Sequence, residues 1–201
     1  MNYNVVAATN EDTVVATYEP SKVRSDSYQN EAELEKEFIR LLCEQGYTYL
    51  PLHTEDELIA NLRSQLEELN HYHFSDTEWR QFFSDVIANP NEHIPEKTRK
   101  IQEDNVQVLH RDDGSSKNIT LIDKKNIHNN RLQVINQYEV KQADGARHDN
   151  RYDVTILVNG FPLVHVELKR RGVAIREAFN QINRYQRDSF WAGCGLYEYV
   201  Q

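Results

Sequence analysis

The sequence of 201 residues predicts an α/β fold, a mixed β-sheet flanked by helices with an added helical layer over residues 54–100. Two observations carry this prediction. Apolar residues recur at helical spacing up to about residue 100, and then fall into alternating runs rich in β-branched and aromatic residues. Neither a repeat nor a low-complexity linker divides the chain. We therefore expect one domain over residues 1–201, with helices at 28–100 and the sheet with its helix at 104–200.

The first half of the chain contains signals for three helices. An apolar stripe runs over residues 27–45 and ends at Gly46. Two capping boxes, in which a Ser or Thr is followed three positions later by Glu, open the next two helices. These boxes are Thr54 with Glu57, and Ser75 with Glu78. Apolar residues at helical spacing follow both, so we expect helices that pack on the sheet rather than carry catalytic groups.

Five strand-like runs follow in the second half. They cover residues 106–110, 118–122, 132–140, 152–158 and 163–168. Asp112-Asp113-Gly114 and Asn159-Gly160 are typical of tight hairpin turns between two pairs of these runs. Further strands are expected at 13–18 and 196–200, and a helix is expected over 173–187.

The helix expected over 173–187 has two faces of different character at 100° per residue. The predicted core stripe is formed by Ile175, Phe179, Ile182 and Gln186, and the strip beside it by Ala174, Ala178, Gln181 and Tyr185. We expect the first set to lie in the core. The small residues of the second set let a polyanion or the sheet edge approach, so Gln181 and Tyr185 can hydrogen-bond a phosphate or steer Lys169. Packing at the border of the core is the more common alternative for these two side chains.

Charge is distributed unevenly along the chain, whose formal net charge is -9. Residues 1–100 hold 9 basic and 19 acidic side chains, whereas residues 101–201 hold 14 and 13. Between residues 146 and 187 there are 8 basic side chains against 4 acidic ones. A site for a polyanion is therefore expected in this stretch, with a solvated basic surface as the alternative.

Composition and cysteine usage point to a soluble protein of a reducing compartment. Cys43 and Cys194 lie far apart and suit neither a disulfide framework nor a zinc site. No apolar run approaches the ~20 residues that span a bilayer, and the N-terminus lacks the pattern of a secretory signal. We expect a cytoplasmic protein without a membrane partner.

Two carboxylates and an amine form the strongest candidate for a catalytic site. Asp153 and Glu167 lie near the ends of two neighbouring predicted strands, and Lys169 follows two positions later. Hydrolysis of a phosphodiester with the help of Mg²⁺ needs oxygen ligands for the metal and positive charge beside the phosphate. Lys169 can orient the attacking water or support the phosphorus, or it can simply pair with Glu167.

The register of the two strands decides whether this site exists. A plain two-residue turn at Asn159-Gly160 would place Asp153 opposite Val166, and Glu167 would then point to the other face of the sheet. We predict a shift of one residue, as produced by a three-residue loop or a bulge, so that Asp153 opposes Glu167. Pro162 favours such an irregularity because it cannot donate to the ladder.

A second set of the same residue types is present. Glu139-Val140-Lys141 has Asp123 upstream and fits the loose pattern equally well. It leads into a loop at 142–146, whereas the set at Glu167 leads into a helix whose face can complete a site. This difference favours Glu167 and Lys169.

The residues around Asp153 and Glu167 resemble a known family. Residues 151–160 read Arg-Tyr-Asp-Val-Thr-Ile-Leu-Val-Asn-Gly, and residues 167–182 read Glu-Leu-Lys-Arg-Arg-Gly-Val-Ala-Ile-Arg-Glu-Ala-Phe-Asn-Gln-Ile. Both runs closely resemble the N-terminal endonuclease domain of the R subunit, the motor and cleavage subunit, of type I restriction enzymes. The resemblance extends over most of the chain, including residues 26–29 and 123–126.

This resemblance implies a nuclease of the PD-(D/E)xK superfamily with a RecB-like Q-x-x-x-Y element. Asp153 and Glu167 would bind Mg²⁺, with Mn²⁺ able to substitute, and Lys169 would be the catalytic lysine. Gln181 and Tyr185 would match Q-x-x-x-Y, which in this family affects DNA cleavage and contacts.

The resemblance also implies further groups near the metal. The backbone carbonyl of Leu168 would assist the two carboxylates. Family members often add a glutamate from the first helix, for which Glu31 and Glu35 are candidates, with solvated helix faces as the alternative. The RecB-like histidine has no clear counterpart, so none of the 8 histidines is assigned that role.

The implied function is that of a Mg²⁺-dependent endodeoxyribonuclease domain, which cleaves duplex DNA without reading bases. No G-x-x-x-x-G-K-[ST] motif is present. ATP binding, translocation and assembly with the modification and specificity subunits would therefore belong to the whole subunit, with the translocase domains outside this chain. The alternative is a nuclease-like docking module that couples the translocase to partner subunits and is catalytically silent alone, which the acidic first half suits.

Overall fold

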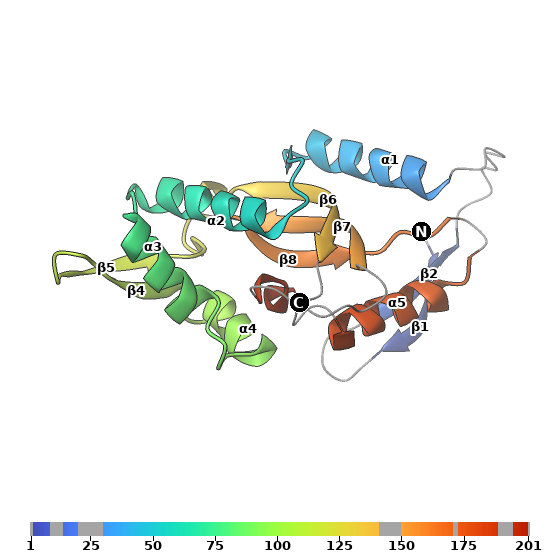
Figure 1. The fold of residues 1–201 in the computed structure, drawn as a ribbon. Helices are drawn as coiled ribbons and strands as arrows, with labels where there is room; N and C mark the ends of the chain where they lie inside the picture. The colour runs from blue at the N-terminus through green and yellow to red at the C-terminus, as the bar shows by residue number, and fades with distance from the viewer. Residues whose placement is uncertain are drawn as a thin grey trace.

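The protein has a mixed α/β fold, as predicted. The computed structural model describes residues 2–8, 14–19, 30–140, 150–170, 173–188 and 195–200. At its centre is a four-stranded sheet in the order β3-β6-β7-β8 (Figure 1). Its strands are β3 (Thr48–Tyr49), β6 (Leu132–Val140), β7 (Asn150–Val158) and β8 (Phe161–Val166). Because β3 pairs in parallel with β6 and the other pairs are antiparallel, the sheet is mixed.

The first half of the chain forms most of the helices, of which the first two cover the central sheet. The helices of this half are α1 (Glu31–Glu44), α2 (Glu55–Asn70), α3 (Asp76–Phe82), the π-helical turn η1 (Phe83–Ile87) and α4 (Ile94–Gln102). Both predicted capping boxes are confirmed, at Thr54 and Ser75. α1 begins later than predicted because Asn30 supplies its own capping box with Glu33. α4, which begins with Pro95 in its first turn, was not predicted.

α1 and α2 cover opposite faces of the sheet. Leu42 of α1 packs with Val134 and Val154 in a small apolar cluster. Leu62 of α2 and its helical neighbours pack in a larger cluster, which contains Ile135, Leu157 and Phe161 of the sheet. Successive residues of a strand point to opposite faces, so the two clusters lie on the two sides of the sheet.

The predicted turn at Asn159-Gly160 is confirmed and anchors the sheet on α2. Both residues have positive φ, 50° and 84°, as a tight hairpin turn between right-twisted strands requires. A Cβ on Gly160 would lie 2.6 Å from Leu62 Cα. Only glycine therefore allows the turn to approach the helix this closely.

Two hairpins form sheets of their own beside the central one. They are β1 (Asn2–Ala8) with β2 (Val14–Glu19), and β4 (Val106–His110) with β5 (Ser116–Thr120). The hairpin signal at Asp112-Asp113-Gly114 is confirmed, and the strand at residues 2–8 was missed. The remaining elements are the short helix η2 (Ile127–Asn129), α5 (Ile175–Asp188) and η3 (Leu196–Tyr199).

The prediction of a strand at residues 196–200 is wrong. This segment is a 3₁₀ helix that follows Gly195, whose φ is 71°. Four consecutive residues, Leu196 to Tyr199, are buried, which a half-buried strand with alternating faces cannot achieve. Glu198 forms a buried ion pair with Lys97 of α4, which holds the segment against the helices. The prediction of a single domain over residues 1–201 stays a prediction.

Candidate active site

The predicted register shift between β7 and β8 is confirmed. Near the turn Val158 pairs with Phe161 and Leu157 with Pro162, but beyond it Ile156 pairs with Val164 and Val154 with Val166. Leu163 is the extra residue, as in a β-bulge. The next position along this register brings Asp153 opposite Glu167, which the unshifted ladder would not do.

Three of the predicted site residues contact one another directly or through one backbone group. Asp153 Oδ2 accepts a hydrogen bond from the backbone N–H of Leu168 at 3.0 Å. Lys169 Nζ donates to Glu167 Oε1 at 2.5 Å. The side chain of Glu167 is 0% exposed and that of Lys169 is 18% exposed, so this charge pair is largely shielded from water.

Burial and charge act differently on the two carboxylates. Burial, with a contribution from the neighbouring Glu167, raises the pKa of Asp153 to about 6 against the lowering effects of the Leu168 amide and Lys169. Burial also acts to raise the pKa of Glu167, but the neighbouring His165 and Lys169 outweigh it, and this pKa lies below its ordinary value. Glu167 is therefore the more strongly ionised member of the pair.

Lys169 stays protonated at the site. Burial alone would lower the pKa of Lys169, but its hydrogen bond to Glu167 and the charges of Asp153 and Glu31 raise that pKa above its ordinary value. A protonated amine can donate hydrogen bonds and neutralise negative charge, but it cannot accept a proton. In this arrangement Lys169 suits electrostatic support of a phosphate or orientation of a water molecule.

The donor set fits a divalent cation that prefers oxygen ligands. Glu167 Oε2 is buried, and no hydrogen-bond donor reaches it from the part of the chain that the structure describes. His165 Nε2 lies 3.6 Å from this oxygen, beyond hydrogen-bond distance. A buried carboxylate oxygen without a donor is costly, and a cation would compensate it. Mg²⁺ uses one or two carboxylates and keeps several waters. Within the described ranges, no group of three or more His, Cys, Asp or Glu side chains that could hold a metal is found.

His165 is a site residue that the sequence analysis missed. It lies on β8, its side chain is 2% exposed, and its ring meets those of Tyr152 and Tyr185 edge-on at 5.1 and 5.7 Å between centroids. The signal was its spacing, because two residues along a strand share a face and His165 precedes Glu167 by two.

Gln181 and Tyr185 of α5 complete the arrangement. Gln181 Nε2 donates to Tyr185 Oη at 2.5 Å, and Tyr185 Oη donates to the carbonyl of Arg151 at 3.0 Å. Burial is the main cause that raises the pKa of the Tyr185 phenol, and the charge of Glu167 adds to it. The phenol is thus committed to the backbone of β7, whereas Gln181 also lines an open groove with Lys169 and Arg184.

The predicted core face of α5 is wrong in part. Ile175 is 57% exposed and Phe179 is 50% exposed, whereas Tyr185 is 2% exposed. The helix presents Tyr185 to the sheet because the aromatic rings of Tyr152 and His165 form the surface that it meets. Ile182 is partly buried, as predicted, and the side chain of Gln186 lies outside the described residues.

The two first-helix glutamates lie in different surroundings. Glu31 is exposed, and its Oε1 accepts from the backbone N–H of Arg170 at 3.3 Å, which places it beside the site. Glu35 is buried and accepts hydrogen bonds from Asn136 and Gln137 of β6. The alternative of a solvated helix face is therefore wrong for Glu35.

The second acidic set does not gather. Glu139 is exposed, and Asp123 Oδ1 accepts from the backbone N–H groups of Lys125 and Asn126 in a turn. Lys141 lies outside the described residues. The choice of the Glu167 set thus agrees with the positions that the structure describes.

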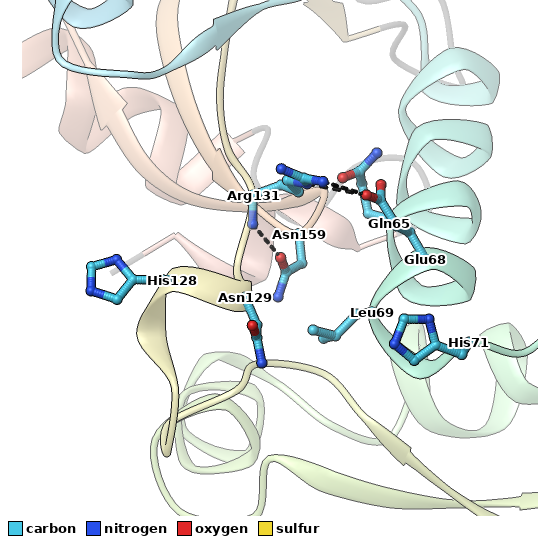
Figure 2. A pocket seen from close by; sticks show the side chains of 8 residues that line it. All are labelled: Gln65, Glu68, Leu69, His71, His128, Asn129, Arg131 and Asn159. Atoms are coloured by element: carbon cyan, nitrogen blue, oxygen red, sulfur yellow. Dashed lines mark hydrogen bonds and ion pairs between the residues drawn. The ribbon is translucent and has the colours of Figure 1, made fainter.

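A separate hollow lies at the opposite end of β7 and β8 (Figure 2). It is lined by Gln65, Glu68, Leu69, His71, His128, Asn129, Arg131 and Asn159. Figure 2 shows Arg131 directed at Glu68, with which it forms an ion pair, while its backbone N–H donates to Asn159. None of the predicted site residues lines this hollow.

The structure describes only part of what the predictions about cysteine usage and the membrane concern. Cys43 is exposed and forms no disulfide, and Cys194 lies outside the described residues. Among the helices of the described segments, none combines the length and the apolar character needed to cross a membrane.

Comparison with known proteins supports the resemblance. Residues 28–201 match the family described as type I restriction enzyme R protein N terminus. The chain is 47% identical over 197 residues to the type I restriction enzyme EcoprrI endonuclease subunit of Escherichia coli, covering 98% of this chain and 62% of that protein. It is 36% identical over 179 residues to the SsaAORF53P endonuclease subunit of Staphylococcus saprophyticus, covering 87% of this chain and 18% of that protein. The chain therefore belongs to the family of type I restriction enzyme R protein N-terminal domains.

Proposed function

We propose that this chain is a Mg²⁺-dependent endodeoxyribonuclease domain of a type I restriction enzyme R subunit, acting on phosphodiester bonds of duplex DNA. The observation that carries the proposal is the shifted register, which places Asp153 opposite Glu167 with Lys169 paired to Glu167. Two carboxylates beside a protonated amine, largely shielded from water, are the groups that metal-assisted phosphodiester hydrolysis needs.

Each residue has a role that follows from its contacts. Asp153 and Glu167 would hold the cation, which when bound neutralises charge on the phosphate and lowers the pKa of a bound water. The protonated amine of Lys169 stabilises negative charge beside it. Tyr185 fixes the backbone of Arg151, two residues before Asp153 on β7, and Gln181 orients the Tyr185 hydroxyl while facing the groove.

The wider function of the whole subunit is part of the proposal. Relatives named as endonuclease subunits are longer than this chain, which covers 62% of one and 18% of another. ATP binding and assembly with modification and specificity subunits are proposed for the remainder of such a protein. Base recognition is not assigned to this chain, since no element of it matches a base-reading motif.

The experiment measures DNA cleavage and metal binding in alanine variants of the three site residues. Asp153→Ala, Glu167→Ala and Lys169→Ala are introduced in the complete subunit and tested for cleavage of plasmid DNA with Mg²⁺ and ATP in the presence of the partner subunits. We expect cleavage to be lost in all three variants. Mn²⁺ binding to the chain, measured by calorimetry, should be lost in the two carboxylate variants and retained in Lys169→Ala.

A matched control comes from the second acidic set. Glu139→Ala removes an exposed glutamate from the same Glu-x-Lys pattern, so it should leave both cleavage and Mn²⁺ binding unchanged. Cleavage by a subunit that carries all three site substitutions would refute the proposal.

A docking function is the second candidate, and one feature of the structure favours it. Val106 and Val108 on one face of β4 are 47% and 48% exposed, so this hairpin presents apolar surface to solvent. A docking module should bind partner subunits equally well with and without metal, and Asp153→Ala should not change that affinity. Loss of partner binding on removal of metal would exclude docking as the main role.

A further inference from the structure

A left-handed residue interrupts β6 beside the candidate site. Gln137 has a φ of 53°, a backbone conformation that is uncommon for residues other than glycine and that clusters at functional sites. The ladder with β7 pairs Asn136 with Val154, and Tyr138 with Tyr152. Gln137 therefore lies at the position that faces Asp153 on the neighbouring strand.

On both strands, the alternation of side chains between the two faces of the sheet is broken at this position. Side chains two positions apart on a regular strand share a face, yet Tyr152 packs in the larger core cluster and Val154 in the smaller one. On β6, Ile135 and Tyr138 share the larger cluster although three positions separate them. The change of face falls at Asp153 on β7 and beside Gln137 on β6.

Glu35 of α1 binds the interrupted segment through both of its oxygens. Asn136 Nδ2 donates to Glu35 Oε1 at 2.6 Å, and Gln137 Nε2 donates to Oε2. Glu35 is 9% exposed, and no Lys, Arg or His of the described segments forms an ion pair with it. Because a buried carboxylate is costly unless hydrogen bonds compensate it, the two carboxamide donors account for its position.

We propose that Glu35 is a positioning residue, which holds Asn136 and Gln137 so that the left-handed break of β6 directs Asp153 toward Glu167. The consequence for metal binding rests on the proposed function, whereas the placement of Asp153 does not. Glu35 acts from outside the set of metal-binding groups, because carboxamide donors occupy both of its oxygens.

The test follows the placement of Asp153 by two independent readouts. The first is the backbone amide of Leu168, which donates to Asp153 and therefore reports its position through its NMR chemical shift and hydrogen-exchange rate in metal-free protein. The second is the Kd for Mn²⁺ from calorimetry. Glu35→Gln replaces one acceptor oxygen with an amide group, which would face the Gln137 amide donor and weaken this contact. We therefore expect the Leu168 amide to change its chemical shift and to exchange faster. We also expect Mn²⁺ binding to weaken about 10-fold.

Substitutions at Gln137 separate the backbone break from the side-chain contact. Gln137→Gly adopts a positive φ without strain, and we expect both readouts to match the wild type even when combined with Glu35→Gln. Gln137→Val opposes a positive φ, so it should impair both readouts although Glu35 is present. Glu37→Gln, an exposed glutamate on the same helix, is the control that should change neither.

Two outcomes would overturn the proposal. One is Glu35→Gln with unchanged Leu168 amide and Mn²⁺ affinity but a lower Tm, which would limit Glu35 to tying α1 to the sheet. The other is the failure of Gln137→Gly to restore the readouts in the double variant. A wild-type chain that binds no Mn²⁺ would refute the proposed function, and the Leu168 amide would still decide the role of Glu35.

Discussion

The backbone N–H of Leu168 donates to Asp153 Oδ2, so the residue after Glu167 is tied to the carboxylate on the neighbouring strand. This bond depends on Leu163 being left out of the strand pairing, because the ladder beyond it is shifted by one position and brings Glu167 rather than Val166 opposite Asp153. The site is therefore built from the pairing of two strands and not from one continuous motif.

A change of register beyond the bulge should remove the site. Insertion of one Ala between Val164 and His165 would place Val166 opposite Asp153 and turn Glu167 to the other face of the sheet. We expect loss of Mn²⁺ binding by calorimetry and loss of cleavage. Deletion of Leu163 removes only the extra residue, keeps Glu167 opposite Asp153 and serves as the control, which should retain Mn²⁺ binding. An insertion variant that folds and binds Mn²⁺ with wild-type affinity would show that this register is not required.

The raised pKa of Asp153 makes its ionised form a cost to stability. The pKa is about 6 in the folded protein against an ordinary value of 3.8, so the folded state holds the proton of Asp153 more tightly than the unfolded state does. The stability associated with this proton is fully present below pH 3.8 and is lost as the pH rises through 6. Asp153→Asn should therefore increase the free energy of unfolding at pH 7 without metal. The increase is at most about 2 kcal/mol, reduced by solvent screening of the partly exposed carboxylate.

Urea denaturation between pH 4 and pH 8 in the presence of EDTA measures this effect. The difference between Asp153→Asn and the wild type should shrink toward zero as the pH falls to 4. Addition of Mg²⁺ should stabilise the wild type but not the variant. A variant that is less stable than the wild type at pH 7 would contradict the assigned environment of Asp153.

The hydroxyl of Tyr185 should contribute to both stability and cleavage. Tyr185→Phe removes the hydrogen bond to the Arg151 carbonyl and leaves this acceptor without that donor, which we expect to cost about 1 kcal/mol of unfolding free energy. Tyr199→Phe is the matched control, because its buried hydroxyl donates to the carbonyl of Ile87 far from the site. Both variants should lose similar stability in urea denaturation, and only Tyr185→Phe should slow cleavage. Equal cleavage rates would limit Tyr185 to a structural role.

Gly160 should be far less tolerant of a side chain than Gly114. Both glycines have positive φ in hairpin turns, 84° and 81°. A Cβ on Gly160 meets Leu62 Cα at 2.6 Å, whereas one on Gly114 has nothing within 4 Å. Gly114→Ala should cost about 1 kcal/mol from backbone strain alone, and Gly160→Ala more, as measured by thermal or urea denaturation. Equal losses would show that α2 and the turn can separate without penalty.

Local signals in the sequence determined most of the elements and the central pair of the site. Capping boxes at Thr54 and Ser75 began α2 and α3 where predicted, because a cap depends on residues three positions apart. The turn at Asn159-Gly160 was predicted correctly because it also depends on residues that are close together in the sequence. The requirement that Asp153 and Glu167 share a face then predicted a register shift of one residue, by a three-residue loop or a bulge, because strand alternation places them on opposite faces without it.

Tertiary structure decided which surfaces those elements present. The sequence placed Ile175 and Phe179 in the core, but the aromatic surface of Tyr152 and His165 selected Tyr185 instead. Likewise, nothing near Glu35 in the sequence indicates that β6 would supply its hydrogen-bond donors about 100 positions away. Sequence periodicity predicts that a helix has an apolar side. The segment that buries a given side of the helix lies far away in the sequence, so only the packed tertiary structure decides which side is buried.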